Sequence, residues 1–326
     1  MAGCCDMGKY ILRRLLLGLV TIWLVTVILF TGLRIVVPAV VGDVVDIMID
    51  ESAKDDTELA DRLRAEFGLN KAIHKQYFDW IGQLLRGDLG ESLFNGRPVS
   101  KEIQDRLPVS LELGLIGLGA TIIVAVPMGI VAALKQDRWP DYLLRGYAVG
   151  SSSVPSFWIA IVIITFASLW WRWAPPLEFT YLHENPIQHI KIMILPGLII
   201  GLTPSGSFLR IMRGQMLEVL RQDYVRTARA KGLSETTVLY RHALRNGLIP
   251  IVTIIGLILP NVIAGTVLFE IIFLLPGMGR YLVESLRFLD YPVIQGTNIV
   301  FALIIVASNL MVDVSYAWID PRIRYS

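Results

Sequence analysis

The stretch Leu113–Leu134, "LGLIGLGATIIVAVPMGIVAAL", carries no charged residue over 22 positions. An α-helix needs about 20 predominantly apolar residues to cross the hydrocarbon core of a bilayer, whereas runs of about 10–14 are typical of buried core helices. Five further uncharged stretches of similar length occur in the chain of 326 residues: Leu15–Leu33, Gly146–Trp171, Ile192–Leu209, Gly247–Phe269 and Tyr291–Val312. The sequence therefore predicts an all-α integral membrane protein with six transmembrane helices.

The distribution of lysine and arginine among the connecting segments predicts the orientation. With the N-terminus in the cytoplasm, the inner segments hold 16 Lys and Arg against seven acids, and the outer segments hold 14 against 18. Positively charged segments resist translocation, so both termini are predicted to be cytoplasmic. The apolar run after Arg14 exceeds the h-region of a typical signal peptide, which favours an uncleaved signal anchor over a cleaved leader. Cys4 and Cys5 would then lie on the reducing side and form no disulfide framework.

This topology divides the chain into four segments. Residues 1–34 comprise the cytoplasmic N-terminus and first transmembrane helix, and residues 35–106 form an extracytoplasmic insertion. Residues 107–319 form a five-helix core, and residues 320–326 are a cytoplasmic tail. Interior prolines predict kinks in several of the core helices, because neighbouring helices in a membrane bundle can satisfy the freed carbonyl groups.

The insertion carries two amphipathic helical patterns. Leu59, Leu63 and Phe67 recur at intervals of four residues in a helix expected to end at Gly68. A second apolar stripe is expected to end at Gly87; its members are Ile73, Tyr77, Trp80, Ile81, Leu84 and Leu85. These patterns predict a small helical lid or shelf, and they leave open whether it binds a partner or only shields the membrane helices.

One cytoplasmic segment stands out by its charge, Asp223–Asn246 or "DYVRTARAKGLSETTVLYRHALRN". Asp223 is a suitable N-cap for a helix that reaches Lys231, Gly232 suits the left-handed position after that helix, and Ser234 can cap a second helix from Glu235 to Arg245. A basic surface next to a membrane can bind anionic lipids. Caps and a defined turn favour instead a shaped knob that docks on a protein.

Sequence motifs for catalysis are absent. The chain contains no G-x-x-x-x-G-K-[ST] phosphate loop, no H-E-x-x-H motif and no G-x-S-x-G elbow, so it is not predicted to be an enzyme or to hydrolyse ATP itself. Three acids lie near the ends of predicted spans, Glu112, Glu270 and Asp313. Ionisable groups at such depth are costly and therefore candidates for function, although their position near the interfaces favours a polar anchor or a helix–helix hydrogen bond.

The charged segment resembles the coupling segment of binding-protein-dependent ABC importer permeases of the dipeptide, oligopeptide and nickel branch. Other stretches similar to that branch follow in order along nearly the whole chain: "YILRRLL" (10–16), "LLRGDLGESL" (84–93), "VPSFWIAI" (154–161), "LPGMGR" (275–280), "DYPVIQG" (290–296) and "DPRIRY" (320–325). Two departures are visible. Arg226-Thr227-Ala228 stands where the family has Glu-Ala-Ala, and "VVPAVVGDVVD" (36–46) loosens the branch's Pro-Gly-Asp-Pro stretch.

The resemblance implies a multi-pass permease of a prokaryotic inner membrane that binds no nucleic acid. It implies a second homologous permease, a paralogue rather than an identical copy, together with two cytoplasmic ATPase subunits and an extracytoplasmic solute-binding protein. The chain itself would hold no cofactor, since ATP and Mg²⁺ would bind to the ATPases. The coupling segment would span residues 213–246, and its contact residues would be Arg226, Thr227, Ala228, Arg229, Ala230, Lys231, Gly232, Leu233 and Ser234.

Four polar residues are candidates for lining the translocation path: Glu270, Ser153, Ser156 and Asn261. The implied cargo is a di- or oligopeptide, and nickel chelates or oligosaccharides remain alternatives within the same architecture. A stand-alone secondary transporter or channel is an alternative of another class. It would be expected to bury more charge at the membrane centre than three acids near the interfaces.

Overall fold

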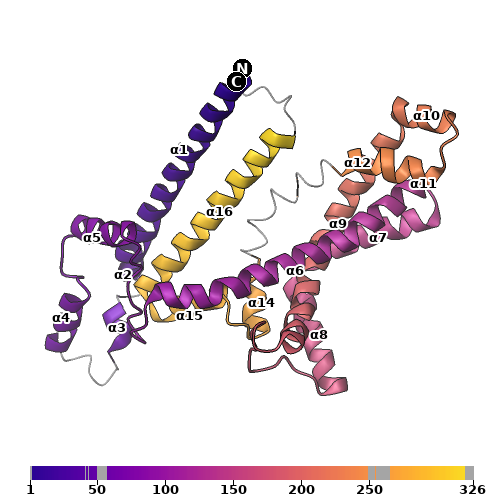
Figure 1. Ribbon diagram of the computed structural model, residues 1–326. Coiled ribbons are helices and arrows are strands. Elements are labelled where there is room, and N and C mark those ends of the chain that lie inside the picture. The colour runs from indigo at the N-terminus through magenta and orange to yellow at the C-terminus, as the bar shows by residue number, and fades with distance from the viewer. Residues whose placement is uncertain are drawn as a thin grey trace. The chain divides into compact units, whose positions relative to one another are not determined.

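The computed structural model describes residues 2–40, 42, 44–49, 57–248, 254 and 265–319, and for residues 2–10, 47, 57 and 313–319 it describes the backbone alone (Figure 1). Regular structure in the described part is helical, apart from one antiparallel β-bridge between Glu91 and Pro98. This agrees with the predicted all-α class. The chain forms two compact units, Met1–Pro108 with Gly277–Ser326, and Val109–Pro276. The division falls inside helix α6 (Val99–Leu134).

The first unit is built on two long helices that lie side by side, α1 (Ala2–Thr31) and α16 (Tyr291–Ile319) (Figure 1). A Cβ atom at Gly18 would lie 2.8 Å from Val306 Cγ1, so the glycine permits this close approach. The backbone of α1 continues through a π-helical turn, η1 (Gly32–Val36), into α2 (Val37–Val40). The first membrane helix therefore extends past Arg34.

The insertion contains the two expected amphipathic helices, α4 (Thr57–Glu66) and α5 (Ile73–Leu85), after a short α3 (Val44–Met48). Gly68 and Gly87 follow them with φ of +67° and +79°, as predicted for residues that end a helix. Helix α5 packs on α1 through aromatic rings, with Phe30 5.2 Å from Tyr77 and stacked 5.8 Å from Trp80. The predicted aromatic stripe is thus the face that fixes the insertion to the first helix.

A buried cluster joins the start of α6 to the short helix α15 (Met278–Phe288). Val99 and Ile103 pack there with Met278, Tyr281 and Val293. The Arg106 guanidinium lies 4.4 Å above the Tyr281 ring, and burial raises the pKa of Tyr281 to about 12.

The second unit contains the remainder of α6 with α7 (Trp139–Ser153), α8 (Ser156–Trp171), α9 (Pro186–Leu220) and α14 (Val267–Ile272). Its largest buried cluster collects apolar side chains from α6, α8, α9 and α14; the buried members are Val109, Leu113, Ala160, Ile192, Met193, Ile199, Phe269, Phe273 and Leu275. Helix α9 contains Pro196 and Pro204, and its N-cap Asn185 accepts a hydrogen bond from the Gln188 amide.

Four described segments are long and apolar enough to cross a membrane: Ile11–Val40, Val99–Leu134, Pro186–Leu220 and Tyr291–Val312. The stretch Gly146–Trp171, expected as one span, is divided between α7 and α8, which are bent by 91° at the break. Val154 is extended there because a residue before proline avoids the helical conformation, and Pro155 begins the next helix. Counting that pair as one span gives five. The remaining predicted span, Gly247–Phe269, lies mostly outside the described residues.

Candidate functional site

The charged segment folds as a helical knob directly after α9. Helix α10 covers Asp223–Ala230, and the following helical stretch runs through α11 (Glu235–Thr237), the π-helical η3 (Val238–Ala243) and α12 (Leu244–Gly247). The predicted second helix is therefore present, with an unpredicted π-helical middle. We call Asp223–Asn246 the knob.

The turn between the two helices has the predicted chemistry. Gly232 has φ of +78°, its amide donates to the Arg229 carbonyl at 2.9 Å, and the Leu233 amide donates to the Ala228 carbonyl at 3.4 Å. These two bonds form a Schellman motif, which satisfies carbonyl groups left open at the end of α10. Ser234 caps the second helix by accepting from the Thr237 amide at 3.3 Å.

The first cap was predicted wrongly. Asp223 was expected to be the N-cap, but Gln222 occupies that position with an extended backbone, and Asp223 is the first residue inside α10. Its side chain is 97% exposed and lies 3.6 Å from Arg226. The Asp223 carboxylate caps no amide, but its place near the positive end of the helix dipole is still favourable.

A small core and two polar contacts hold the knob together. Val225, Ala228 and Val238 are buried against one another, and Val219 at the end of α9 packs on them. Arg229 binds Glu235 through two nitrogens, at 2.9 and 3.2 Å, and so bridges the helices across the glycine turn. The Asn246 amide donates to the Tyr224 hydroxyl at 2.9 Å.

The predicted coupling residues gather on this one knob. Ala228 is buried in its core, and the other eight are exposed. The surface is basic with apolar points, since Arg226 is 71% exposed at its side chain and Leu233 is 40% exposed. Such a surface has the shape and charge for docking on an acidic or mixed partner surface.

The predicted path residues do not come together as one site. Glu270 is fully buried and accepts hydrogen bonds from Ser110 and Thr266, each at 2.7 Å. Ser153 is exposed and donates to the Val149 carbonyl, and Ser156 is half-buried beside the α7–α8 break. Asn261 lies outside the described residues, so the lining of a path by these side chains stays a prediction.

The other two acids near the ends of predicted spans are Glu112 and Asp313, and the structure describes the side chain of Glu112 only. Glu112 lies 2.7 Å from Nε2 of His189, whose ring is 98% buried and whose Nδ1 lies 2.8 Å from the Thr180 carbonyl. This is a helix–helix hydrogen bond between α6 and α9. The side chain of Asp313 is outside the described part of the chain.

Sequence reasoning missed a buried ion pair between α7 and α9. The Arg213 guanidinium donates to both carboxylate oxygens of Asp141 at 2.7 Å, and the Asp141 side chain has no exposed surface. Arg145 approaches the same carboxylate at 3.6 Å. A signal was present, because Asp141 and Arg145 are four residues apart and share one helix face. The prediction of membrane helices considered only uncharged stretches, and neither Asp141 nor Arg213 lies within one of them.

Two of the motifs that carried the resemblance meet in the first unit. Ser92 of "LLRGDLGESL" donates to Asp290 of "DYPVIQG" at 2.5 Å, and the Leu93 amide donates to the same carboxylate at 3.3 Å. A Cβ at Gly90 would lie 3.3 Å from Pro292 Cβ. The two segments therefore pack as one structural element.

Comparisons with known proteins agree with this architecture. The family model described as the binding-protein-dependent transport system inner membrane component matches residues 125–325, which include the entire knob. The chain belongs to this family. Members of the family are transmembrane components of transport systems, not enzymes, so this chain is a multi-pass inner membrane permease component.

Full-length relatives support the assignment. The chain is 37% identical over 342 residues to the dipeptide transport system permease protein DppB of Escherichia coli K12, covering 98% of this chain and 99% of that protein. It is 35% identical over 324 residues to the oligopeptide transport system permease protein AppB of Bacillus subtilis, covering 98% and 100%. The similarity thus includes the insertion as well as the core of this permease component.

Proposed function

We propose that this permease component forms, with a second homologous permease, the membrane path of a peptide importer. Peptides would arrive from an extracytoplasmic solute-binding protein, and two cytoplasmic ATPases would bind ATP and Mg²⁺ and supply the energy. The proposal draws on the names of the relatives, which are dipeptide and oligopeptide permeases. It draws equally on the knob, which gives the chain a structured surface for an ATPase.

The knob is the observation that carries the coupling role. It has its own core at Val225, Ala228 and Val238, and its turn is closed by the Schellman motif and the Arg229–Glu235 pair. A segment that only attracts anionic lipids needs positive charge but no fixed shape. A groove on a partner protein requires the knob to hold one conformation, because ordering a loose segment on binding would cost affinity.

Transport would then follow from a shift between two packed states. ATP binding closes the ATPase pair, the knob moves with the ATPase, and the membrane helices change which side of the bilayer the path opens to. The chain needs differential contacts with the two ATPase states and no nucleotide site of its own. The same geometry would serve nickel chelates or oligosaccharides, and the names of the relatives favour peptides over these.

The decisive substitution is Gly232→Val. Gly232 has φ of +78° and open space around it, so valine would meet a backbone penalty without a clash. The knob should lose its turn, and peptide uptake and peptide-stimulated ATPase activity should both fall to background, with unchanged affinity for the solute-binding protein. Gly232→Asn is the matched control, because asparagine tolerates the left-handed conformation and should retain most of the transport.

Both variants keep the charge of the knob, so a lipid-binding role predicts no difference between them. Uptake of labelled dipeptide into proteoliposomes, with the second permease, the ATPases and the binding protein reconstituted, measures the outcome. Normal uptake by Gly232→Val would refute the coupling role. Uptake that needs no ATPase subunits would favour a secondary transporter instead.

A further inference from the structure

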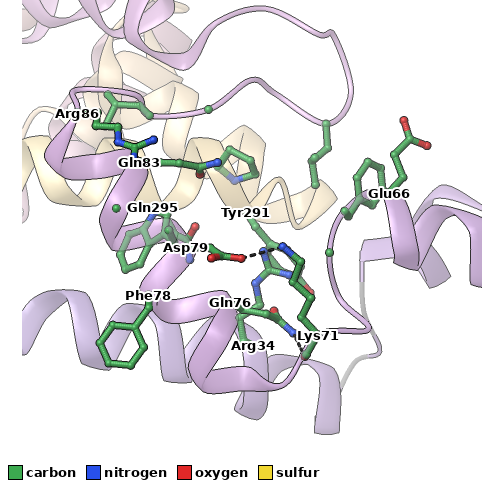
Figure 2. Close-up of a pocket in the computed structure, with 18 residues that line it drawn as sticks. Arg34, Glu66, Lys71, Gln76, Phe78, Asp79, Gln83, Arg86, Tyr291 and Gln295 are labelled. Atoms are coloured by element: carbon green, nitrogen blue, oxygen red, sulfur yellow. Dashed lines mark hydrogen bonds and ion pairs between the residues drawn. The ribbon is translucent and has the colours of Figure 1, made fainter.

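A pocket of about 570 Å³ lies within the first unit, formed by η1, α5 with the turn before it, and the start of α16 (Figure 2). Arg34 comes from η1, Lys71 and Asp79 from the α5 region, and Tyr291 and Gln295 from α16. Pockets of about 300–1,000 Å³ are typical of sites that enclose small molecules. The volume therefore suits a ligand of the size of a short peptide.

The pocket presents buried hydrogen-bond donors without acceptors. Nε and Nη1 of Arg34 are buried and have no hydrogen-bond partner among the described atoms. The side chain of Gln295 is 3% exposed, and its amide nitrogen likewise has no acceptor there. Buried polar groups are nearly always hydrogen-bonded in native proteins, so these donors point to an acceptor that occupies the pocket.

The Arg34 guanidinium lies against α16, the helix that carries Gln295. The Arg34 guanidinium lies 4.6 Å above the ring of Tyr291, which is four residues before Gln295. Residues four apart are neighbours on a helix surface. A ligand that reaches Arg34 over Tyr291 is therefore next to the Gln295 amide.

The position of Arg34 is set by an unusual backbone. Its helix turns π-helical at Gly32–Val36, and such turns occur frequently at functional sites. A charged side chain within a membrane helix is costly to keep. Asp79, one of the two acids that line the pocket, is bound to Lys71 at 2.8 Å, as the dashed line in Figure 2 marks.

The charge of the lining favours an anion. Its cations are Arg34, Lys71 and Arg86, against Glu66 and Asp79. Each of the two unpartnered nitrogens of Arg34 can donate to a carboxylate oxygen, and such charge-assisted bonds are about twice as strong as neutral ones. Aromatic and aliphatic residues also line the pocket, among them Phe67, Trp80 and Leu93, and they can cover the apolar part of a ligand.

We infer that this pocket binds the C-terminal carboxylate of a short peptide, with Arg34 and Gln295 donating to its oxygens. The peptide as ligand class rests on the proposed function, whereas the anion site rests on the unpartnered donors alone. The ligand would reach the site on the extracytoplasmic side in the predicted topology. The insertion would then take part in cargo binding as well as shielding the membrane helices.

Binding can be tested on the purified full-length chain in lipid nanodiscs, without ATPases or binding protein. Isothermal titration with dialanine, dialanine amide and acetate separates the contributions of the carboxylate and the peptide. Dialanine should bind, and the amide and acetate should each bind at least about tenfold more weakly, since a charged hydrogen bond is lost with the amide. This comparison needs no variant and so is independent of folding.

Two variants localise the site. Gln295→Glu keeps the side-chain size and adds a negative charge, and Arg34→Met keeps the length and removes the donors; each should weaken dialanine binding about tenfold or more. Arg62→Gln is the control, because that guanidinium is 75% exposed on α4 outside the pocket; it should bind dialanine as the unmodified chain does.

Equal binding of dialanine and its amide would overturn the inference, as would equal binding of acetate, or dialanine binding unchanged by both pocket variants. A failure here leaves the proposed function intact if Gly232→Val still abolishes ATP-driven uptake. Conversely, a confirmed pocket in a chain whose uptake ignores Gly232→Val would refute the coupling role alone.

Discussion

The carboxylate of Asp141 is a buried, ion-paired charge in the second unit. It is fully buried, accepts two short bonds from Arg213 and lies near Arg145. Taking one member from a buried ion pair leaves the other charge without compensation, which is far more destabilising than the pair itself is stabilising. The pair therefore acts as a clamp between α7 and α9.

Substitution Asp141→Asn should destabilise the protein by about 3–5 kcal/mol, because Arg213 would remain buried without its counter-charge. Thermal unfolding in detergent, followed by tryptophan fluorescence, measures the loss. Asp137→Asn is the control: that side chain is 65% exposed and 3.8 Å from Arg145, so the loss should stay below about 1 kcal/mol. Equal losses in both variants would contradict the clamp.

For the carboxyl group of Asp290, in contrast to that of Asp141, burial is the dominant electrostatic effect. Burial raises the pKa of its carboxyl group above the ordinary value of 3.8, and the hydrogen bonds from Ser92 and the Leu93 and Val293 amides oppose that rise only in part. Between pH 3.8 and the raised pKa, the folded protein binds more protons at Asp290 than the unfolded chain does. Stability from this group is therefore highest at low pH and is lost as the pH rises through the folded pKa.

Asp290→Asn should remove this pH dependence. The unfolding temperature of the variant relative to that of the unmodified protein should increase as the pH rises from the ordinary carboxyl value of 3.8 through the raised pKa of Asp290. The asparagine Oδ1 can still accept from the Leu93 amide, and its Nδ2 can donate to the Ser92 hydroxyl, so the packing is kept. A pH-independent difference would show that Asp290 does not titrate in this range.

At the scale of the elements, α6 and α9 cross with almost no space between their backbones. A Cβ at Gly201 would contact the Gly117 carbonyl oxygen and lie 2.7 Å from Ala120 Cβ. The Thr121 hydroxyl donates to the Gly117 and Gly201 carbonyls, both at 3.0 Å. Small residues allow such approaches in membrane helices.

Gly201→Ala should therefore force the helices apart and cost about 1–3 kcal/mol, because the obstructing atoms belong to backbone. Gly119→Ala lies on α6 with no atom within 4 Å of its added Cβ, and it should be neutral. Unfolding temperatures of the two variants, compared in the same detergent, measure the contrast. A neutral Gly201→Ala would place the α6–α9 contact elsewhere.

Local chemistry was readable from the sequence, and long-range pairing was not. Gly68, Gly87, Gly232 and Ser234 end or begin helices as expected, because their backbone and capping preferences act within one turn. The N-cap at Gln222 differs from the prediction by one residue, because the extended backbone that precedes the helix ends at Gln222 and Asp223 is already helical.

Partners distant along the chain were beyond reach. Asp141 and Arg213 are 72 positions apart, and Ser92 and Asp290 are 198 apart. The pocket combines η1, the α5 region and α16. One sequence fixes which residues are polar, but only the fold decides which of them meet. The break at Pro155 was foreseen as a kink, and the 91° bend exceeds what a proline inside one helix suggests.

At the scale of the whole molecule, the orientation in the membrane is the prediction with the widest consequences. It places the insertion outside, where a binding protein could deliver cargo, and the knob inside, where an ATPase could bind. The charge asymmetry alone supports it. Residues 35–106 and the knob must therefore respond oppositely to reagents that cannot cross the bilayer.

Single cysteines can test this in a background with Cys4 and Cys5 replaced by serine. Leu85 on α5 is 83% exposed and Tyr240 in the knob is 64% exposed, so Leu85→Cys and Tyr240→Cys should both be reactive when accessible. An impermeant maleimide applied to intact spheroplasts should label Leu85→Cys, and label Tyr240→Cys only after permeabilisation. The reverse pattern would invert the topology.

The length of helix α9 and its two interior prolines determine where this helix can bend. It has 35 residues, about 52 Å of rod, and ends two residues before α10, with Val219 packed into the knob. Pro196 and Pro204 lack amide hydrogens and are its most compliant points, about 36 and 24 Å from its C-terminal end. A displacement of α10 should therefore move the part of α9 after Pro204 as one rigid piece, and bending should be concentrated at the two prolines. A displacement of the knob would therefore bend α9 at Pro196 and Pro204 and so move the part of the helix that precedes them.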